Sequence, residues 1–116
     1  MRDERERLRD ILDAIAAIEK YAARGRTAFE RDELVQTWIV RHIQIIGEAA
    51  RGLSDVLRTR YPQVPWAQIV AMHHILVHDY FGIDIQEVWS AVEHDLPDLK
   101  RKVEAILHEL GGAAQP

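Results

Sequence analysis

A broad apolar band between residues 34 and 53 constrains the fold of this chain more than any other feature. Its members recur at helical spacing: Leu34, Val35, Trp38, Ile39, His42, Ile43, Ile45, Ile46, Ala49 and Leu53. The band is wider than one stripe, so the helix should be central or contact two partners. Gly47 interrupts it at a cost of about 1 kcal/mol relative to alanine, which predicts close helix packing there. We expect His42 to be a hydrogen-bonded core histidine rather than a ligand.

The remaining segments carry the same helical period. Residues 3–23 form an amphipathic stripe that ends at Gly25. The next helix begins either at a capping box formed by Thr27 and Glu30 or at Asp32. The pattern therefore predicts two consecutive helices joined by a short connection.

Two prolines within residues 58–65 forbid a helix across that connection. Pro65 fits the first turn of the following helix, and Gly82 is suited to be its C-cap. Asp84 is the expected N-cap of the last segment. Pro97 either kinks that segment or begins a fifth helix capped by Asp95.

No segment shows the alternation of a strand, so the sequence predicts an all-α protein. Short connections favour an antiparallel up-and-down bundle of four to five helices. Residues 1–110 should form a single domain, and residues 111–116 a flexible C-terminal tail. The wide band leaves apolar surface to spare, which would suit a homodimer.

Composition excludes several classes of protein. No apolar run approaches the roughly 20 residues of a membrane span. The absence of cysteine excludes disulfides and thiolate chemistry. The N-terminus is of mixed charge and has no signal-peptide pattern, so we expect a cytoplasmic protein. We also expect that the protein uses no cofactor.

The charges are unevenly distributed along the chain. Residues 61–99 contain no Lys or Arg but hold six acids: Asp79, Asp84, Glu87, Glu93, Asp95 and Asp98. A site for nucleic acid in this span would need cations from elsewhere, with Arg41, Arg51, Arg58 and Arg60 as candidates.

Residues 71–82 hold the densest group of reactive side chains: His73, His74, His78, Asp79 and Tyr80. A polar cluster at the end of a buried helix must be fully hydrogen-bonded or open onto a cleft. The cluster therefore decides between a structural and a functional interpretation.

Three chemical interpretations compete. His74 and His78 lie four residues apart and can share a metal ion with Asp79, and His94 is the only further candidate ligand. Ile75 stands where such a pair usually holds a glutamate, so we expect no metal site. The second interpretation is general acid–base catalysis by His78 on a phosphodiester. Histidines bonded to backbone carbonyls are the third, slightly favoured on the residues alone.

Two runs in the sequence resemble the HepT-like family of HEPN-domain proteins. They are residues 41–50, RHIQIIGEAA, and residues 75–84, ILVHDYFGID. Val88–Trp89 and residues 95–99 match the family pattern as well. The resemblance extends from about Arg5 to Leu110, and its motifs agree in order. It implies a HEPN-like helical bundle that forms a homodimer.

The resemblance also implies an activity and a partner. Such proteins are toxins of a type VII-like toxin–antitoxin system, and the antitoxin is a minimal nucleotidyltransferase. The toxin acts on RNA, not DNA, as a metal-independent ribonuclease with the motif arginine, four to six residues, then His-x-Tyr. That motif falls on His78 and Tyr80. The antitoxin neutralises the toxin by transferring AMP from ATP to the residue that corresponds to Tyr80.

Position 73 departs from this motif, because His73 stands where the family has arginine. Arginine is permanently cationic and binds phosphate through two parallel hydrogen bonds, whereas histidine is mostly neutral at pH 7. His73 and Tyr80 nearly eclipse on a helix, so His73 can face the same cleft. It then either pairs with His78 as acid and base or marks an impaired copy.

The expected catalytic residues are His78, His73 and Tyr80, and Tyr80 is also the AMP acceptor. Supporting residues are Asp79 and His74, and RNA or partner contacts fall on Arg41 and Arg51. The alternative function is a non-catalytic module that dimerises and binds the nucleotidyltransferase.

Overall fold

The computed structural model describes residues 3–78 and 84–111, and only the backbone of residues 75–78. The elements are α1 (Glu4–Ala22), α2 (Arg26–Arg31), α3 (Glu33–Arg51), α4 (Asp55–Arg60), α5 (Trp66–His78), α6 (Ile85–Ser90), the π-helical turn η2 (Ala91–Asp95) and α7 (Leu96–Glu109). These described residues contain no strand, which confirms the all-α prediction.

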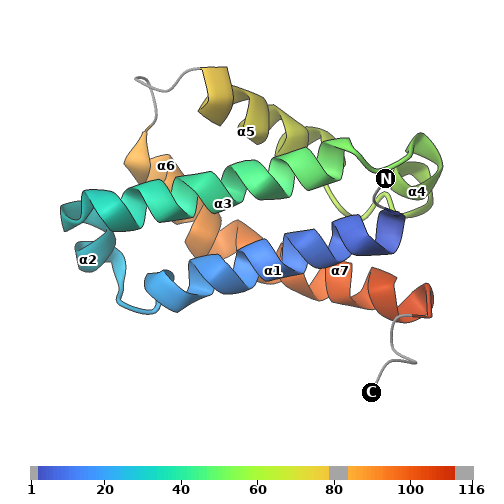
Figure 1. The fold of residues 1–116 in the computed structure, drawn as a ribbon, viewed down its shortest axis with the longest axis horizontal. Coiled ribbons are helices and arrows are strands. Elements are labelled where there is room, and N and C mark those ends of the chain that lie inside the picture. Colours follow the sequence, from blue (N-terminus) through green and yellow to red (C-terminus); the bar gives the residue numbers. More distant parts are fainter. Residues whose placement is uncertain (1–2, 79–83, 112–116) are drawn as a thin grey trace.

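Four helical rods alternate in direction: α1, α3, α5 and the run α6–η2–α7 (Figure 1). Helix α3 packs against both α1 and α5, as the width of its apolar band predicts. Helix α7 packs along α1 and closes the bundle. The fully buried side chains of the rods come from α1, α3 and the run α6–η2–α7 and include Ile11, Ile39, Val88, Val103 and Ile106, whereas α5 contributes Trp66, which is 6% exposed. No described helix is both long and apolar enough to cross a bilayer.

The N-terminal caps are set by acidic side chains. Asp3 accepts from the Glu6 amide at 2.9 Å and completes a capping box. Asp32 accepts from the Leu34 amide at 2.9 Å and begins α3, as predicted. The capping box expected at Thr27 is wrong. Gly25, whose φ of 94° favours glycine, precedes α2, and Thr27 lies inside that helix.

The connection after α3 is more helical than the sequence indicated. Ser54 accepts from the Leu57 amide at 3.0 Å and caps α4, so Arg58 to Arg60 are helical rather than part of the linker. Pro65 precedes α5 instead of lying in its first turn. Residues 79–83, including the expected C-cap Gly82, lie outside the described residues.

The last segment is one continuous run rather than two capped helices. Asp84 caps it as predicted, accepting from the Gln86 amide at 2.9 Å. Asp95 occupies the N-cap position of α7 and Pro97 lies in its first turn, as predicted, but the Asp95 side chain makes no cap bond. Pro97 lacks an amide donor and crowds the preceding turn, and the π turn η2 directly before α7 accommodates this within the run.

Gly47 is a point of close approach between α3 and α5. A methyl group added there would overlap Cβ of His73 and lie 2.7 Å from its Cγ and 3.1 Å from its Cα. The predicted close packing at this glycine is confirmed. Its missing side chain is what allows His73 to lie against α3.

Replacing Gly47 with alanine should therefore separate α3 from α5. We expect Gly47→Ala to lower the free energy of unfolding by roughly 1–3 kcal/mol, as overpacking does, measured by urea denaturation. Gly52→Ala is the matched control, because the three atoms nearest to its added methyl all belong to the flexible guanidinium of Arg7. Equal losses in both variants would contradict this role for Gly47.

Candidate active site

The expected catalytic residues are divided between described and undescribed parts of the chain. His78 is the last residue of α5, and only its backbone is described. Asp79 and Tyr80 lie outside the described residues. His73 and His74 are described with their side chains, so the structure shows the surroundings of these two candidate residues.

His73 is held between α3 and α5 by an ion pair with Glu48. The two atoms, His73 Nε2 and Glu48 Oε2, are 3.2 Å apart, and 15% of the histidine side chain is exposed. A carboxylate at this distance favours the protonated, cationic form of an imidazole. The contact with Glu48 thus favours a positive charge at position 73, where the resemblance implies an arginine, and burial of the ring opposes that charge.

Glu48 has a second basic partner in Arg51, one turn further along α3. The Arg51 guanidinium donates to both carboxylate oxygens, at 3.1 and 3.3 Å. This hydrogen bond is the largest cause of a lowered Glu48 pKa, which partial burial opposes and the charges of Arg51, His73 and Arg7 reinforce. Glu48 therefore stays ionised in mildly acidic solution. Arg51, an expected RNA contact, remains largely exposed but is already paired.

A surface hollow of about 360 Å³ lies beside this pair. Its lining comes from three helices: Arg7 and Asp10 of α1, Arg41, Gln44, Ile45, Glu48 and Ala49 of α3, and His73 of α5. Arg41 is exposed and forms no ion pair with any described residue. The structure therefore brings two of the predicted residues, His73 and Arg41, to one hollow.

The other histidines do not assemble a metal site in the described part of the chain. No three His, Asp or Glu side chains converge there. His74 is exposed, and His94 bonds the Ser90 carbonyl at 3.2 Å. His42 is half-buried and its Nδ1 lies 2.7 Å from the Trp38 carbonyl, as expected for a hydrogen-bonded histidine beside the core.

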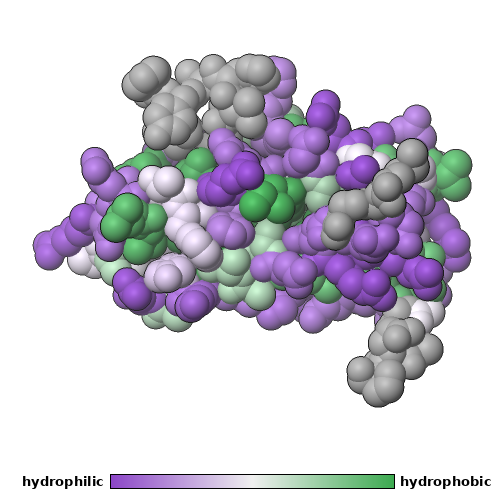
Figure 2. Space-filling model, viewed as in Figure 1, coloured by the Kyte–Doolittle hydropathy of each residue, from purple (hydrophilic) through white to green (hydrophobic). Residues whose placement is uncertain are grey.

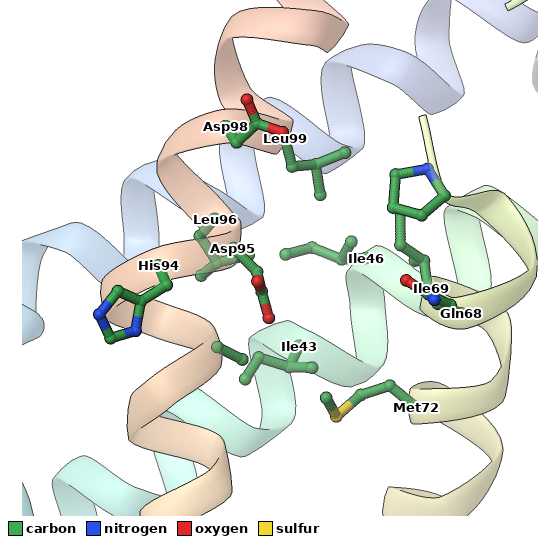
Figure 3. Close-up of a pocket in the computed structure, with 12 residues that line it drawn as sticks. Ile43, Ile46, Gln68, Ile69, Met72, His94, Asp95, Leu96, Asp98 and Leu99 are labelled. Carbon is green, nitrogen blue, oxygen red and sulfur yellow. The ribbon is translucent and has the colours of Figure 1, made fainter. Parts of the chain in front are cut away.

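A second hollow of about 400 Å³ lies between α5 and the η2–α7 run (Figure 3). Its walls are mainly apolar: Ile43, Ile46, Ile69, Met72, Leu96 and Leu99. Asp95 points into it, and the His94 ring points away. Carboxylates but no Lys or Arg line it, so it is a poor place for phosphate.

The fold and the first hollow define a small all-helical protein with a histidine and arginines on one surface. The chain belongs to the HepT-like family, since the model described as "Ribonuclease HepT-like" matches residues 11–106. It is 33% identical over 108 residues to the "Probable ribonuclease HepT" of Thermococcus cleftensis, covering 90% of this chain and 96% of the relative.

Another relative is the protein MJ1380 of Methanocaldococcus jannaschii, whose name describes a candidate RNase. It is 37% identical over 78 residues, which cover 67% of this chain and 72% of the relative. No solved structure matches the chain. The family identified from the residue motifs is thereby confirmed.

Glu48, Arg7 and Asp10 lie at the hollow but were missed as site residues by sequence reasoning. Glu48 falls within the run RHIQIIGEAA that carries the resemblance. The prediction of close packing at the neighbouring Gly47 was the available signal, because an acid beside that contact must face α5 or its flank. The partner across the contact could not be named without the register of the two helices.

The Glu48 contact should govern when His73 is charged. We expect Glu48→Gln to lower the pH at which the His73 ring titrates, because an amide provides hydrogen bonding but no negative charge. NMR of ¹³C,¹⁵N-labelled histidine measures this midpoint. The exposed His74, next in the sequence, is the internal control. An unchanged His73 midpoint, or an equal shift at His74, would contradict the assignment.

Proposed function

We propose that this protein is a metal-independent endoribonuclease whose active site lies at the end of α5, beside the hollow that contains His73. The observation that carries the proposal is the His73–Glu48 pair, which favours a cation where the family motif has one. Membership of the HepT-like family and the ribonuclease names of its relatives support it.

The proposed reaction uses two histidines. His78 accepts the proton of a ribose 2′-hydroxyl as that oxygen attacks the neighbouring phosphorus. The bond from phosphorus to the 5′-oxygen breaks, and His73, as an imidazolium, donates its proton to the leaving oxygen. The products are a cyclic phosphate and a 5′-hydroxyl end. Tyr80 hydrogen-bonds the phosphate, and Asp79 and His74 support the histidines.

Because position 73 holds a histidine instead of the motif arginine, its positive charge depends on pH. Because the Glu48 pKa is lowered, the carboxylate persists from mildly acidic pH upward. His73 is charged only below its own titration point. The ion pair between Glu48 and His73 is therefore complete at pH values above the titration of Glu48 and below that of His73. Phosphate binding weakens as the pH rises above the titration of His73.

The proposal includes regulation in the cytoplasm by an antitoxin. As a toxin, the protein is neutralised when a nucleotidyltransferase transfers AMP from ATP to the Tyr80 hydroxyl, with release of pyrophosphate. A bulky anion beside His73 would occupy the site and repel RNA phosphate. A homodimer is also part of the proposal, and the open apolar hollow between α5 and α7 supports it.

Cleavage without divalent metal tests the catalytic assignment. Purified protein in EDTA should cleave single-stranded RNA, and His78→Ala should reduce the rate by roughly 10²–10⁴. His73→Arg is the informative second variant. It should maintain RNA binding at high pH, where the wild type loses affinity, because arginine stays charged.

Two outcomes would overturn this proposal. Equal cleavage by wild type and His78→Ala would show a contaminant or another catalytic residue. Absence of cleavage in both the wild type and His73→Arg, with binding to the nucleotidyltransferase intact, would identify the protein as the non-catalytic partner-binding module.

The modification is tested by intact mass. Incubation with the cognate nucleotidyltransferase and ATP should add the mass of AMP and abolish RNA cleavage. Tyr80→Phe should gain no mass. Tyr61→Phe is the control, because Tyr61 is a buried tyrosine outside the candidate site, and this variant should gain as much mass as the wild type. A mass gain retained in Tyr80→Phe would exclude Tyr80 as the acceptor.

A further inference from the structure

The outward face of α3 carries an exposed stripe that runs between α1 and α5. Its members are spaced at helical repeats: Leu34, Trp38, Arg41, Ile45 and Glu48. Leu34 is 81% and Trp38 39% exposed, Arg41 and Glu48 are exposed, and Ile45 is half-buried. The stripe ends at the hollow that contains His73. It thus connects the candidate site to the opposite end of the bundle.

Trp38 is the centre of an aromatic cluster on this stripe. Its ring lies 4.4 Å from the His42 ring, tilted by 39°, and 5.2 Å from the Tyr21 ring in an edge arrangement. Its indole nitrogen donates to the Ala17 carbonyl of α1 at 2.8 Å. The hydrogen bond and the two ring contacts fix the orientation of a partly exposed indole. A fixed, exposed aromatic ring is what a stacking nucleobase requires.

Cations surround this cluster. The Arg24 guanidinium lies 4.9 Å from the centre of the Tyr21 ring, and the Lys20 ammonium 5.7 Å from it. Neither forms an ion pair with a described residue, and the same holds for Arg41. These three positive charges are therefore available to an anionic ligand.

The wider distribution of charge follows the same pattern. Within the described chain, the basic residues of α4 and α7 are all in ion pairs: Arg58, Arg60, Lys100, Arg101 and Lys102. Those that form none come from residues 5–41, in or beside α1, α2 and α3: Arg5, Arg7, Arg9, Lys20, Arg24, Arg31 and Arg41. Figure 2 views this side and shows pale and green residues over the start of α3, with hydrophilic residues around them.

We propose that this face is the binding track for the single-stranded RNA substrate. A nucleobase stacks on Trp38, and the backbone phosphates contact Arg24 and Arg41 on the way to His73. Trp38 and Glu48 are ten residues apart, or about 15 Å along the helix, a span that a short single strand can cover. The inference rests on the proposed ribonuclease function and adds where the substrate lies.

The three tryptophans of the chain make this proposal directly observable. Trp66 and Trp89 are each 6% exposed, so Trp38 is the accessible one. Short single-stranded RNA added to the His78→Ala protein should quench its tryptophan fluorescence. Trp38→Leu in the same background should abolish the quenching and weaken RNA binding roughly 5- to 100-fold in fluorescence anisotropy. Trp38→Phe, which keeps a ring, should retain most of the affinity.

Salt dependence tests the cations separately. For single-stranded RNA, the logarithm of the binding constant falls as the logarithm of the salt concentration rises, and each lost phosphate contact makes this negative slope shallower by about 0.7. Arg24→Ala and Arg41→Ala should each show this change. Val56→Ala is the control, since Val56 is 79% exposed on α4 and away from the stripe. It should change neither affinity, slope nor quenching. Circular dichroism and light scattering establish that each variant is folded and report its mass.

The outcomes separate this inference from the proposed function. If the wild type cleaves RNA and Trp38→Leu neither loses quenching nor weakens binding, the track is wrong and the ribonuclease stands. If Trp38→Leu instead lowers the oligomeric mass with RNA affinity unchanged, the face is a protein interface and the track is again wrong. If the protein neither binds nor cleaves RNA, the proposed function fails and the track fails with it.

Discussion

The close contact between Gly47 and His73 is the constraint on which the candidate site depends. Helix α5 packs mainly on α3, and a single missing side chain lets the two backbones approach there. That approach brings the His73 ring within 3.2 Å of a carboxylate on the next residue of α3. One glycine therefore fixes both the packing of a rod and the electrostatic setting of a candidate site histidine.

The two surface hollows, one at His73 and one between α5 and the η2–α7 run, differ in the charge of their lining rather than in size. They are similar in volume, about 360 and 400 Å³. The one at His73 has arginines from α1 and α3, whereas the other has apolar walls and an acidic rim. The acidic span of residues 61–99 explains the difference, because it supplies α5, α6 and η2 with no Lys or Arg. An anion attracted to the helix that carries the histidines must therefore be held by α1 and α3.

The sequence predicted the parts of the fold that depend on local periodicity, and missed those that depend on register. The central position of α3 follows from the width of its apolar band, and Asp32 and Asp84 cap their helices because short acids can bond nearby amides. The π turn η2 before Pro97 was not predicted, because the periodic pattern of apolar residues does not specify it. Likewise, the closeness of α3 and α5 at Gly47 was predictable, but the His73–Glu48 pair was not. It requires knowing which residue of α5 stands opposite.

Glu48 has two competing cations, and this competition bears on the exchange of arginine for histidine. Arg51 holds both oxygens of the carboxylate, while His73 contacts one of them. A phosphate that drew the largely exposed Arg51 away would leave more of the negative charge to His73 and so favour its protonation. Binding of the anion would then help create the second cation that binds it. Arginine at this position would carry its charge regardless of ligand, so such coupling would require the histidine.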